Sequence, residues 1–431
     1  MNQATSTNCI FPVTDFTVFK DKVLSWASQF NTFCFLDNHQ FDSNYRSAEC
    51  VMAAGVHRSL SAQAGSALTQ LQQFLSNKNT WLFGHLGYDL KNEIEDLRTL
   101  NRDRIGFPDL FFFQPEILIR FDQRSVAVEG ETEDAEKIFD EILSGELLQE
   151  SHQRPGIIRS RIPRAQYVET IEQLKHHILR GDCYEINFCQ EFFAENAWID
   201  PLIVYKQLSD VSPNPFSCLY KLNDKYLLCA SPERFLKKDG DKILSQPMKG
   251  TAKREQDWQI DAASKRYLAA SRKDRSENIM VVDLVRNDLS KVCCEGSVKV
   301  EELCAVYSFP HVHQMISTIS GRVRADMTFC EIIRSTFPMG SMTGAPKKKV
   351  MELIDQYEKT KRGIFSGAVG YITPTGDFDF NVVIRSIMYN EVSKYLSFQA
   401  GSAITFYSDA EQEWEECLLK AAAIKSVLGK P

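Results

Sequence analysis

The apolar positions of the chain recur with helical spacing in several stretches. The clearest lies between Pro163 and Gly181, where apolar residues stand three or four positions apart, the period of one buried helical face. Its members are Tyr167, Ile171, Leu174 and Ile178. Proline is typical of a helix start, and glycine of a position just past a helix end. Similar patterns predict helices over residues 131–150, over 262–285, from Pro346 onward and over 411–428.

Shorter apolar runs bounded by glycine, proline or polar residues predict strands. They are residues 81–90, 110–122, 184–193, 226–229, 242–245, 369–372, 381–388 and 395–400. Strands that follow one another without regular alternation with helices favour an α+β fold with largely antiparallel sheets. The stretch 151–161 contains Pro-Gly and predicts a linker, so we expect an N-terminal subdomain of residues 1–155 and a second region of residues 156–431.

Composition argues against several classes of protein. The 57 acidic residues outnumber the 50 basic ones, and no dense basic run offers a surface for nucleic acid. The 12 cysteines are irregularly spaced and form no CxxC motif, which argues against a zinc or redox site. No run approaches the ~20 apolar residues that cross a bilayer, and no signal peptide is evident. We therefore expect a reduced, cytoplasmic protein that binds neither nucleic acid nor membrane.

Lys249 is the candidate nucleophile. It lies in the segment QPMKGT, after a predicted strand and before a polar stretch, with no acidic neighbour in the sequence. A lysine amine becomes nucleophilic when burial or a neighbouring cation lowers its pKa. Taken alone, the segment fits a surface lysine in a turn better, because most lysines are exposed. The other motifs of the chain change this interpretation.

A series of short segments in a fixed order carries a family resemblance. They are GDCYEINF, SPERF, QPMKGT, SENIMVVDLVRNDL, GSMTGAPK, FSGAVGY, FNVVIRS, QAGSAI and EECLLKA. Together they resemble the chorismate-binding enzymes, a family that includes anthranilate synthase component I, aminodeoxychorismate synthase component I, isochorismate synthase and salicylate synthase. The resemblance is dense from about residue 163 to the C-terminus. It implies one large domain of two stacked sheets with helices outside, and an active site in a cleft between the sheets.

Acidic residues three positions apart, which share one face of a helix, are the candidate metal ligands. Asp274 and Glu277 form one such pair, and Glu413 and Glu416 form another. From the spacing alone, a solvated acidic face is the commoner interpretation. The resemblance implies that Glu277 and Glu416 hold Mg²⁺ and that Asp274 supports them. Mg²⁺ suits such a site because it takes few protein oxygens and completes its shell with water and substrate.

Arg385 is the candidate for binding a substrate carboxylate. It follows apolar residues of a predicted strand, where a guanidinium needs an anion because an unpaired buried charge is costly. An arginine that reaches solvent from a strand end fits the pattern equally well. The resemblance implies that Arg385 binds the enolpyruvyl carboxylate of chorismate, with Gly401 admitting backbone N–H groups and Ser341 adding a hydroxyl. Thr251 of QPMKGT is expected in the same substrate site.

Glu233 and Lys249 carry the chemistry that the resemblance implies. Glu233, in SPERF, is expected to be the general acid/base near the C4 hydroxyl, which requires a raised pKa. An ion pair with Arg234 is the alternative. Members that form anthranilate usually have alanine at the position of Lys249, whereas the covalent members that form aminodeoxychorismate have lysine. The resemblance therefore implies amination of chorismate at C4, with Lys249 attacking C2 and no loss of pyruvate.

Ammonia is expected from a separate glutamine amidotransferase, because the chain has no Gly-x-Cys-x-Gly motif of that class. Two alternatives remain open. One is the formation of anthranilate, against which Lys249 argues. The other is a non-catalytic chorismate-family scaffold or sensor, which would need none of the implied site residues. Binding of tryptophan to the N-terminal region also remains open.

Several positions depart from the residues that are usual in the family. Phe365 stands where a tyrosine hydroxyl commonly reaches a carboxylate. Gln314 stands at the place of a catalytic histidine, with His311 and His313 beside it on one predicted strand face. Glu185 stands where related enzymes often have glutamine, and where the isochorismate and salicylate synthases have a lysine that activates water.

Overall fold

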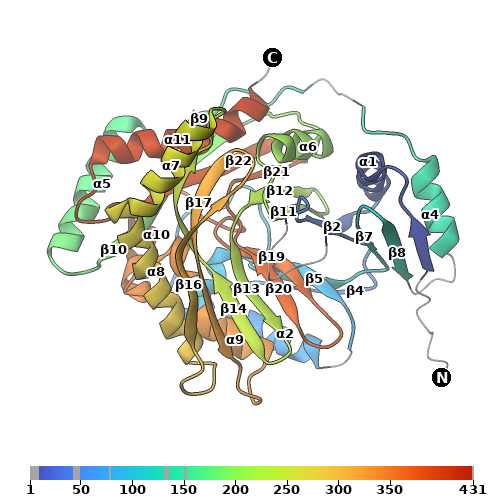
Figure 1. Cartoon of the computed structure of the whole chain (residues 1–431), viewed down its shortest axis with the longest axis horizontal. Coiled ribbons are helices and arrows are strands. Elements are labelled where there is room, and N and C mark those ends of the chain that lie inside the picture. Colours follow the sequence, from blue (N-terminus) through green and yellow to red (C-terminus); the bar gives the residue numbers. More distant parts are fainter. Residues whose placement is uncertain (1–8, 42–48, 77–78, 131–134, 150–152, 430–431) are drawn as a thin grey trace.

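Two antiparallel sheets, here called sheet A and sheet B, form the centre of the molecule (Figure 1). The computed structural model describes residues 9–41, 49–76, 79–130, 135–149 and 153–429. Within these ranges every paired strand is antiparallel, and helices flank both sheets. The predicted α+β fold of two stacked, largely antiparallel sheets is therefore confirmed.

Sheet A has 12 strands. In spatial order they are β1 (Cys9–Pro12), β8 (Ser125–Gly130), β7 (Ile117–Phe121), β3 (Cys50–Ala54), β2 (Thr32–Asp37), β11 (Phe216–Leu222), β12 (Lys225–Ser231), β21 (Ser386–Asn390), β22 (Tyr395–Ile404), β10 (Glu185–Ala194) and β18 (Gly344–Ala345), with β9 (Arg159–Ser160) beside β10.

Sheet B has 10 strands. In spatial order they are β15 (Met248–Lys253), β17 (Val312–Arg322), β14 (Lys242–Gln246), β13 (Arg234–Asp239), β20 (Phe378–Asn381), β19 (Ala368–Ile372), β5 (Leu82–Leu86), β6 (Leu110–Gln114) and β4 (Arg58–Ala62), with β16 (Lys299–Ser308) beside β17.

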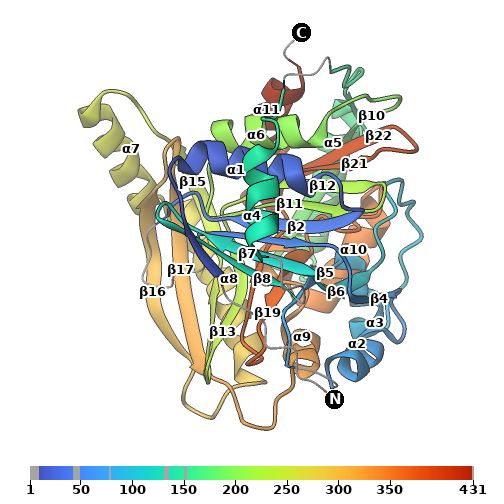
Figure 2. The ribbon, with the colours of Figure 1, turned by 90° about the vertical axis from the view of Figure 1, so that its right-hand side faces the viewer.

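The helices surround the two sheets, with α7 beside β15 and β16 at one edge (Figures 1 and 2). They are α1 (Phe16–Ala27), α2 (Ala67–Leu75), α3 (Lys91–Glu95), α4 (Ala135–Ser144), α5 (Arg164–Leu179), α6 (Pro201–Val211), α7 (Trp258–Ala270), α8 (Arg272–Ser290), α9 (Phe329–Thr336), α10 (Lys347–Tyr357) and α11 (Ala410–Leu428), with short 3₁₀ turns η1 (Tyr88–Leu90) and η2 (Gly340–Met342).

Two apolar layers hold these elements together. One fills the space between the sheets and continues beneath α2, α8 and α9 on the outer face of sheet B. The other lies between the outer face of sheet A and the helices α1, α4, α5, α6, α10 and α11. The predicted stripe of α5 belongs to the second layer, where Tyr167 packs against Phe188 of β10 and Trp414 of α11. The helical spacing read from the sequence thus identified a buried face.

Strands from both ends of the chain share the sheets. In sheet A, β2 pairs with β11, and in sheet B, β5 pairs with β19. Hydrogen bonds between strands therefore join residues before and after position 155 in both sheets. The division of the chain into residues 1–155 and 156–431 stays a prediction.

Several predicted elements differ from the structure. Residues 110–122 form two strands, β6 in sheet B and β7 in sheet A, and residues 88–90 form the turn η1 and not the end of a strand. Residues 262–285 were expected to form one helix, but Ser271 ends α7 and caps α8, its side chain accepting a hydrogen bond from the backbone N–H of Asp274. Residues 381–388 were expected to form one strand, but β20 ends at Asn381 in sheet B and β21 begins at Ser386 in sheet A. Residues 382–385 carry the chain from one sheet to the other. The apolar run is buried because it crosses the core, which a strand pattern cannot distinguish from a buried strand.

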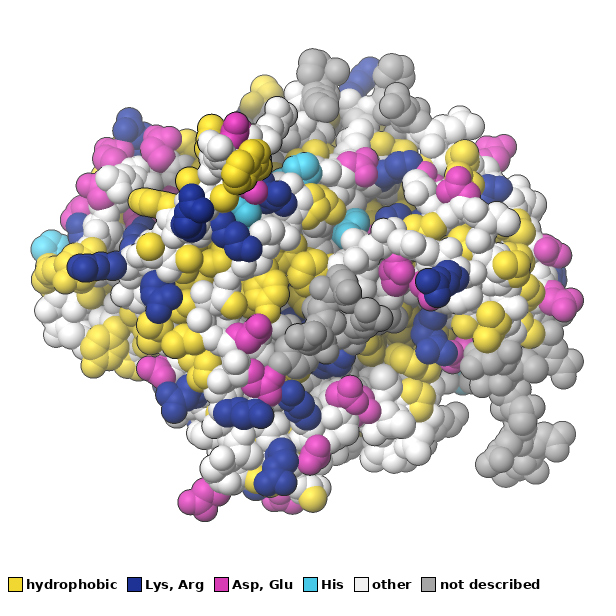
Figure 3. Space-filling model, in the orientation of Figure 1, with side chains coloured by type: hydrophobic (Ala, Val, Ile, Leu, Met, Phe, Trp, Pro, Cys, Tyr) yellow, Lys and Arg dark blue, Asp and Glu magenta, His cyan; other side chains and the backbone are white. Residues whose placement is uncertain are grey.

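No helix in the described part of the chain is long and apolar enough to cross a membrane. Basic and acidic side chains are interspersed over the face shown in Figure 3. A mixed distribution of this kind offers no extended basic surface, which agrees with the excess of acidic residues in the sequence.

Candidate active site

Residues from distant parts of the sequence meet where sheet A faces sheet B. Lys249 lies on β15 of sheet B, and its ammonium interacts electrostatically with Glu233, Glu277 and Glu416. Arg385, in the crossing segment 382–385, interacts with Glu233. The structure therefore brings together the predicted nucleophile, the predicted acid, the two predicted metal ligands and the predicted carboxylate-binding arginine.

Lys249 bridges the two sheets. Its Nζ donates a hydrogen bond to Oε1 of Glu185, the first residue of β10, at 2.9 Å. The pairing of β15 with β17 shifts register between Met248 and Thr251, so Lys249 lies in an irregular part of the strand. Burial disfavours the charged form, yet the carboxylates of Glu185 and Glu277 raise the pKa of Lys249 above its ordinary value. The expected activation by a lowered pKa is therefore wrong for this state, in which the lysine is an ammonium ion.

Glu185 is a site residue to which the sequence assigned no role. It is 2% exposed, and its Oε2 has no hydrogen-bond partner among the described residues. The only signal in the sequence was a glutamate at a position where related enzymes often have glutamine. A buried carboxylate at the start of a predicted apolar strand needs a cation, and the structure identifies that cation as Lys249.

Glu233 lies between β12 and β13 and is 3% exposed. Its backbone N–H donates to Oγ of Ser231 at 3.2 Å, and its carbonyl accepts from the backbone N–H of Val382 at 3.0 Å. Burial raises the pKa of Glu233 to about 7, against the opposing effects of the Ser341 hydroxyl and the Lys249 ammonium. A carboxyl group with this pKa can both donate and accept a proton near neutral pH.

The alternative partner for Glu233, Arg234, points elsewhere. The Arg234 guanidinium binds both carboxylate oxygens of Asp379, at 2.9 and 3.0 Å, and donates to the side chain of Gln246 at 2.7 Å. The two adjacent residues of SPERF therefore have separate tasks. The Arg234 side chain links β13 to the neighbouring strands β14 and β20 of sheet B, whereas Glu233 faces the candidate site.

Carboxylates from α8 and α11 surround one ammonium group. Lys273 Nζ lies 4.0 Å from Glu277 Oε1, 3.6 Å from Glu413 Oε1 and 3.9 Å from Glu416 Oε2. Burial raises the pKa of Glu277 to about 7. Burial acts in the same direction on Glu416, but Lys420, at 2.8 Å, and Lys273 hold the pKa of Glu416 below its usual value. The sequence had suggested Glu413 only as a spacing partner of Glu416, and it had not suggested Lys273.

The predicted metal ligands suit a magnesium ion, which needs few protein ligands, better than a metal ion that is coordinated by protein side chains alone. No three described His, Cys, Asp or Glu side chains are arranged to hold a metal by themselves. Mg²⁺ commonly takes one or two carboxylates and fills its remaining positions with water and substrate oxygens. Oε1 of Glu277 and Oε2 of Glu413 are buried without hydrogen-bond partners among the described residues, and the cluster already holds the cation Lys273. The Asp274 side chain packs against Gly250 of β15.

Arg385 is held in a left-handed backbone conformation, with φ 49°. It lies in the crossing segment and not in a strand as predicted. Among the described residues no acidic side chain forms an ion pair with it, and burial lowers the pKa of its guanidinium to about 10 against the electrostatic effect of Glu233. An unpaired, partly buried guanidinium beside Glu233 and Lys249 is suited to bind a carboxylate.

The three remaining predicted substrate residues have different surroundings. Ser341 lies in η2, buried beside Glu233. Gly401 lies on β22 opposite Cys189 of β10, and a Cβ there would come within 2.0 Å of the Phe188 carbonyl oxygen. Close strand packing thus already requires this glycine. Thr251 is exposed on β15. Their contacts with substrate stay predictions.

Gln314 and His313 point to opposite faces of β17, because successive strand residues alternate. The His313 ring is held by Asp261 of α7 at 3.0 Å and by Ser308 at 2.9 Å. The Gln314 side chain is buried, and its amide has no hydrogen-bond partner in the described chain. His313 therefore supports α7 and cannot replace the family's imidazole at the position of Gln314. His311 and His313 were expected on one face of a strand. This expectation is wrong, because His311 precedes β17, which begins at Val312.

Comparison with known proteins agrees with this geometry. The family model described as chorismate binding enzyme matches residues 24–426. The chain belongs to the chorismate binding enzyme family. It is 42% identical over 271 residues to aminodeoxychorismate synthase of Streptomyces pristinaespiralis, which is 63% of this chain and 37% of that protein. It is 33% identical over 350 residues to aminodeoxychorismate synthase component 1 of Escherichia coli K12, which is 80% of this chain and 76% of that protein.

The fold also has a close structural counterpart. Anthranilate synthase component I from Streptococcus pneumoniae superimposes with a TM-score of 0.79 over 90% of this chain and 94% of that chain, at 23% sequence identity. At this identity the likeness concerns the fold alone. The chain spans much less than two thirds of the Streptomyces relative and about three quarters of the Escherichia coli one.

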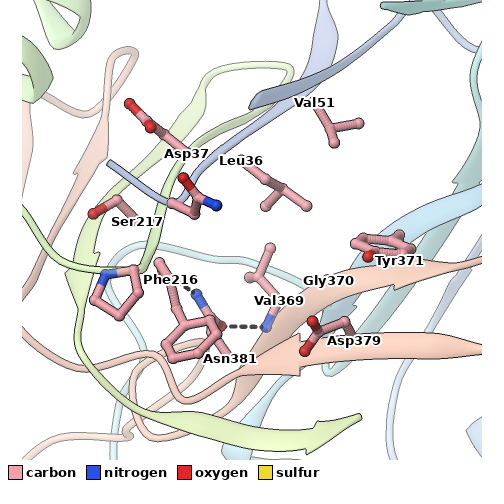
Figure 4. Close-up of a pocket in the computed structure, with 12 residues that line it drawn as sticks. Leu36, Asp37, Val51, Phe216, Ser217, Val369, Gly370, Tyr371, Asp379 and Asn381 are labelled. Atoms are coloured by element: carbon pink, nitrogen blue, oxygen red, sulfur yellow. Dashed lines mark hydrogen bonds between the residues drawn. The ribbon is translucent and has the colours of Figure 1, made fainter. Parts of the chain in front are cut away.

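A separate pocket, which Lys249 does not line, lies between β2, β3 and β11 of sheet A and β19 and β20 of sheet B (Figure 4). Leu36 and Val51 of sheet A face Val369 and Tyr371 of sheet B across it, and Asn381 accepts a hydrogen bond from the Val369 backbone at 2.9 Å. Its volume of about 40 Å³, as bounded by described residues, has room for a few water molecules.

Proposed function

We propose that the chain is aminodeoxychorismate synthase component I, which converts chorismate and ammonia into 4-amino-4-deoxychorismate and water. The observation that carries the proposal is Lys249, a lysine whose side chain is only 9% exposed and lies among carboxylates, at the position where anthranilate-forming members usually have alanine. The names of the Streptomyces and Escherichia coli relatives support the same reaction. The product is a precursor of para-aminobenzoate in the folate branch.

The binding of chorismate uses positive charge at both carboxylates. Glu277 and Glu416 would hold Mg²⁺, with Asp274 supporting them, and the bound ion would neutralise the ring carboxylate. The Arg385 guanidinium would bind the enolpyruvyl carboxylate with two parallel hydrogen bonds. Its lack of an acidic partner among the described residues supports this role, because a free fork is available to the substrate.

The covalent step is assigned to Lys249 and Glu233. The Lys249 amine attacks C2 of the ring, and the ring double bond shifts as the C4 hydroxyl leaves. Glu233, whose pKa is about 7, donates the proton with which this hydroxyl leaves as water. Ammonia then adds at C4 and expels the lysine amine. The pyruvyl group remains attached throughout, which distinguishes this reaction from anthranilate formation.

Ammonia is proposed to come from a separate glutamine amidotransferase in the cytoplasm. The word component in the name of the Escherichia coli relative supports a multi-subunit enzyme. All 12 cysteines are free thiols, which supports a reducing compartment.

A product assay tests the proposed function. The purified chain is incubated with chorismate, an ammonium salt and Mg²⁺, and the products are separated and identified by mass. The expected product is 4-amino-4-deoxychorismate without pyruvate release. Anthranilate with stoichiometric pyruvate would establish the first alternative, and unchanged chorismate with measurable binding would establish a scaffold.

A further inference from the structure

The ion pair between Lys249 and Glu185 presents a chemical problem for the proposed reaction. An ammonium ion has no lone pair, so Lys249 must lose a proton before it can attack C2. The surrounding carboxylates act in the opposite sense, because they raise the pKa of Lys249. Simple dissociation to water near neutral pH is therefore unfavourable, and the site needs a group that takes the proton from Nζ.

Among the described residues, Glu185 is the only one whose side chain accepts a hydrogen bond from the Lys249 ammonium. Its Oε1 lies 2.9 Å from Lys249 Nζ, a normal distance for proton transfer along a hydrogen bond. Its Oε2 is buried and has no hydrogen-bond partner within the described chain, so no second hydrogen bond competes for this carboxyl group. Both side chains are almost fully shielded, at 9% exposure for Lys249 and 2% for Glu185.

The other carboxylates near Lys249 have different positions and tasks. Glu233 must arrive at the step carrying a proton, which it gives to the leaving hydroxyl. Glu277 and Glu416, on α8 and α11, belong to the proposed metal site, and Lys273 balances them in the structure. Glu185 alone is free of a second role.

We propose that Glu185 is a catalytic base: it takes one proton from the Lys249 ammonium when chorismate fills the site, and returns it when the lysine leaves. This inference rests on the proposed function. Its physical basis is desolvation. When substrate displaces water, a buried ion pair loses hydration energy, whereas the neutral pair of amine and carboxylic acid loses much less. The closed site therefore favours the form in which Lys249 is nucleophilic.

The atoms and protons balance over the cycle. Transfer of a proton from Lys249 to Glu185 yields a free amine, which forms a bond to C2 and becomes a secondary ammonium as the C4–O bond breaks. The hydroxyl leaves as water with the proton of Glu233. Ammonia forms the C4–N bond, the C2–N bond breaks, and the released lysine amine recovers its proton from Glu185. The new C4 ammonium gives one proton to Glu233, which restores the starting state.

The Glu185→Gln variant tests the inference, because glutamine retains a hydrogen-bond acceptor for Lys249 but cannot take up a proton. The probe is the rate at which a Lys249–chorismate adduct forms, followed by mass spectrometry of quenched samples without ammonia. At neutral pH we expect adduct formation to slow on the order of 100-fold. The ratio of the wild-type rate to the variant rate should fall toward one as pH rises, because hydroxide can then deprotonate the lysine in both proteins. The titration of Glu233 affects both rates equally and therefore cancels in this ratio.

A purely electrostatic role for Glu185 predicts the opposite result. Removing its charge would lower the pKa of Lys249, so the variant would form the adduct as fast as the wild type or faster at neutral pH. That outcome would overturn the inference. If the wild-type chain forms 4-amino-4-deoxychorismate, the proposed function stands regardless. If it forms neither product nor adduct, the proposed function fails first.

Glu185→Asp provides a second test that does not depend on the glutamine variant folding. Aspartate keeps the carboxylate but withdraws it by one methylene group. We expect a lower rate of adduct formation with the pH dependence of the wild type. An aspartate variant whose rate equals that of the wild type at every pH would contradict a base that acts at 2.9 Å from Nζ. Thermal unfolding of each variant serves as the folding control.

Discussion

The Lys273 ammonium of α8 lies 3.6 Å from Oε1 of Glu413 on α11, at the point where the two helices bring their carboxylates together. Glu277 and Glu416 lie within 4.0 Å of the same ammonium. The Lys273 side chain is 54% exposed, so it can turn into solvent without loss of core packing. One amino group thus balances the charge of a cluster that is proposed to hold a divalent cation.

Replacement of Lys273 by methionine should make the fold more dependent on Mg²⁺. Without the ammonium, the carboxylates of α8 and α11 repel one another, so the melting temperature without metal should fall. Added Mg²⁺ should raise the melting temperature more in the variant than in the wild type, because no ammonium competes for the carboxylates. Thermal unfolding over a magnesium titration measures both effects. Lys348→Met, at an exposed position of α10, is the control, and equal magnesium shifts in both variants would contradict the assignment.

Glu277→Gln and Glu416→Gln should each raise the magnesium concentration needed for turnover and for thermal stabilisation. Each change removes one negative charge from the proposed pair of ligands while keeping the shape of the side chain. Glu415→Gln is a matched control, since Glu415 lies on the exposed face of α11. A magnesium requirement that is unchanged in both ligand variants would refute their role as ligands.

Lys249→Ala should lower aminodeoxychorismate formation by several orders of magnitude, because the variant lacks the amine that forms the covalent intermediate. The mass adduct on the peptide that contains residue 249 should disappear. Far-ultraviolet circular dichroism should remain that of the folded wild type. A variant that retains full activity would exclude covalent catalysis by this lysine.

Glu233→Gln should change the pH dependence of stability. The pKa of Glu233 is raised from 4.5 to about 7, so the folded state favours its protonated form. Such a group destabilises the fold as pH rises from about 4.5 to about 7, by about 3 kcal/mol once it is fully ionised. Glutamine cannot ionise, so the variant escapes this loss of stability. The free energy of unfolding of the variant minus that of the wild type should therefore increase as pH rises over this range. Urea unfolding at a series of pH values measures the difference, and a constant difference would contradict the raised pKa.

The isolated chain should use ammonium salts but not glutamine. Ammonia, and not ammonium, attacks C4, so raising pH increases the reactive species while it removes the proton of Glu233. Glutamine should be inert because the sequence has no Gly-x-Cys-x-Gly motif, whose cysteine would form the glutamyl thioester. Glutamine-dependent turnover by the chain alone, with contaminating amidotransferase excluded, would overturn the proposal of a separate partner.

Local pattern was sufficient for most elements of secondary structure. The stripe of α5, the proline at the start of α10 and the apolar run of β10 each satisfy a periodicity that short-range sterics and burial impose. The pattern of apolar and polar residues gave wrong element boundaries at several places. The run at 382–384 is apolar because it passes through the core between the sheets, and Ser271 divides a continuous helical pattern because it caps α8.

The sequence by itself determined the kinds of chemical group in the site, since motifs and their order identified Lys249, Glu233, Glu277, Arg385 and Glu416. Only the tertiary structure decided the charge state and partners of these groups. Lys249 and Glu185 are 64 positions apart, yet their atoms are 2.9 Å apart. Electrostatic interaction depends on distance in space and on exposure to water, and neither quantity is encoded in local spacing. For that reason the sequence predicted a lysine with a lowered pKa, whereas the fold holds an ammonium ion beside a buried carboxylate.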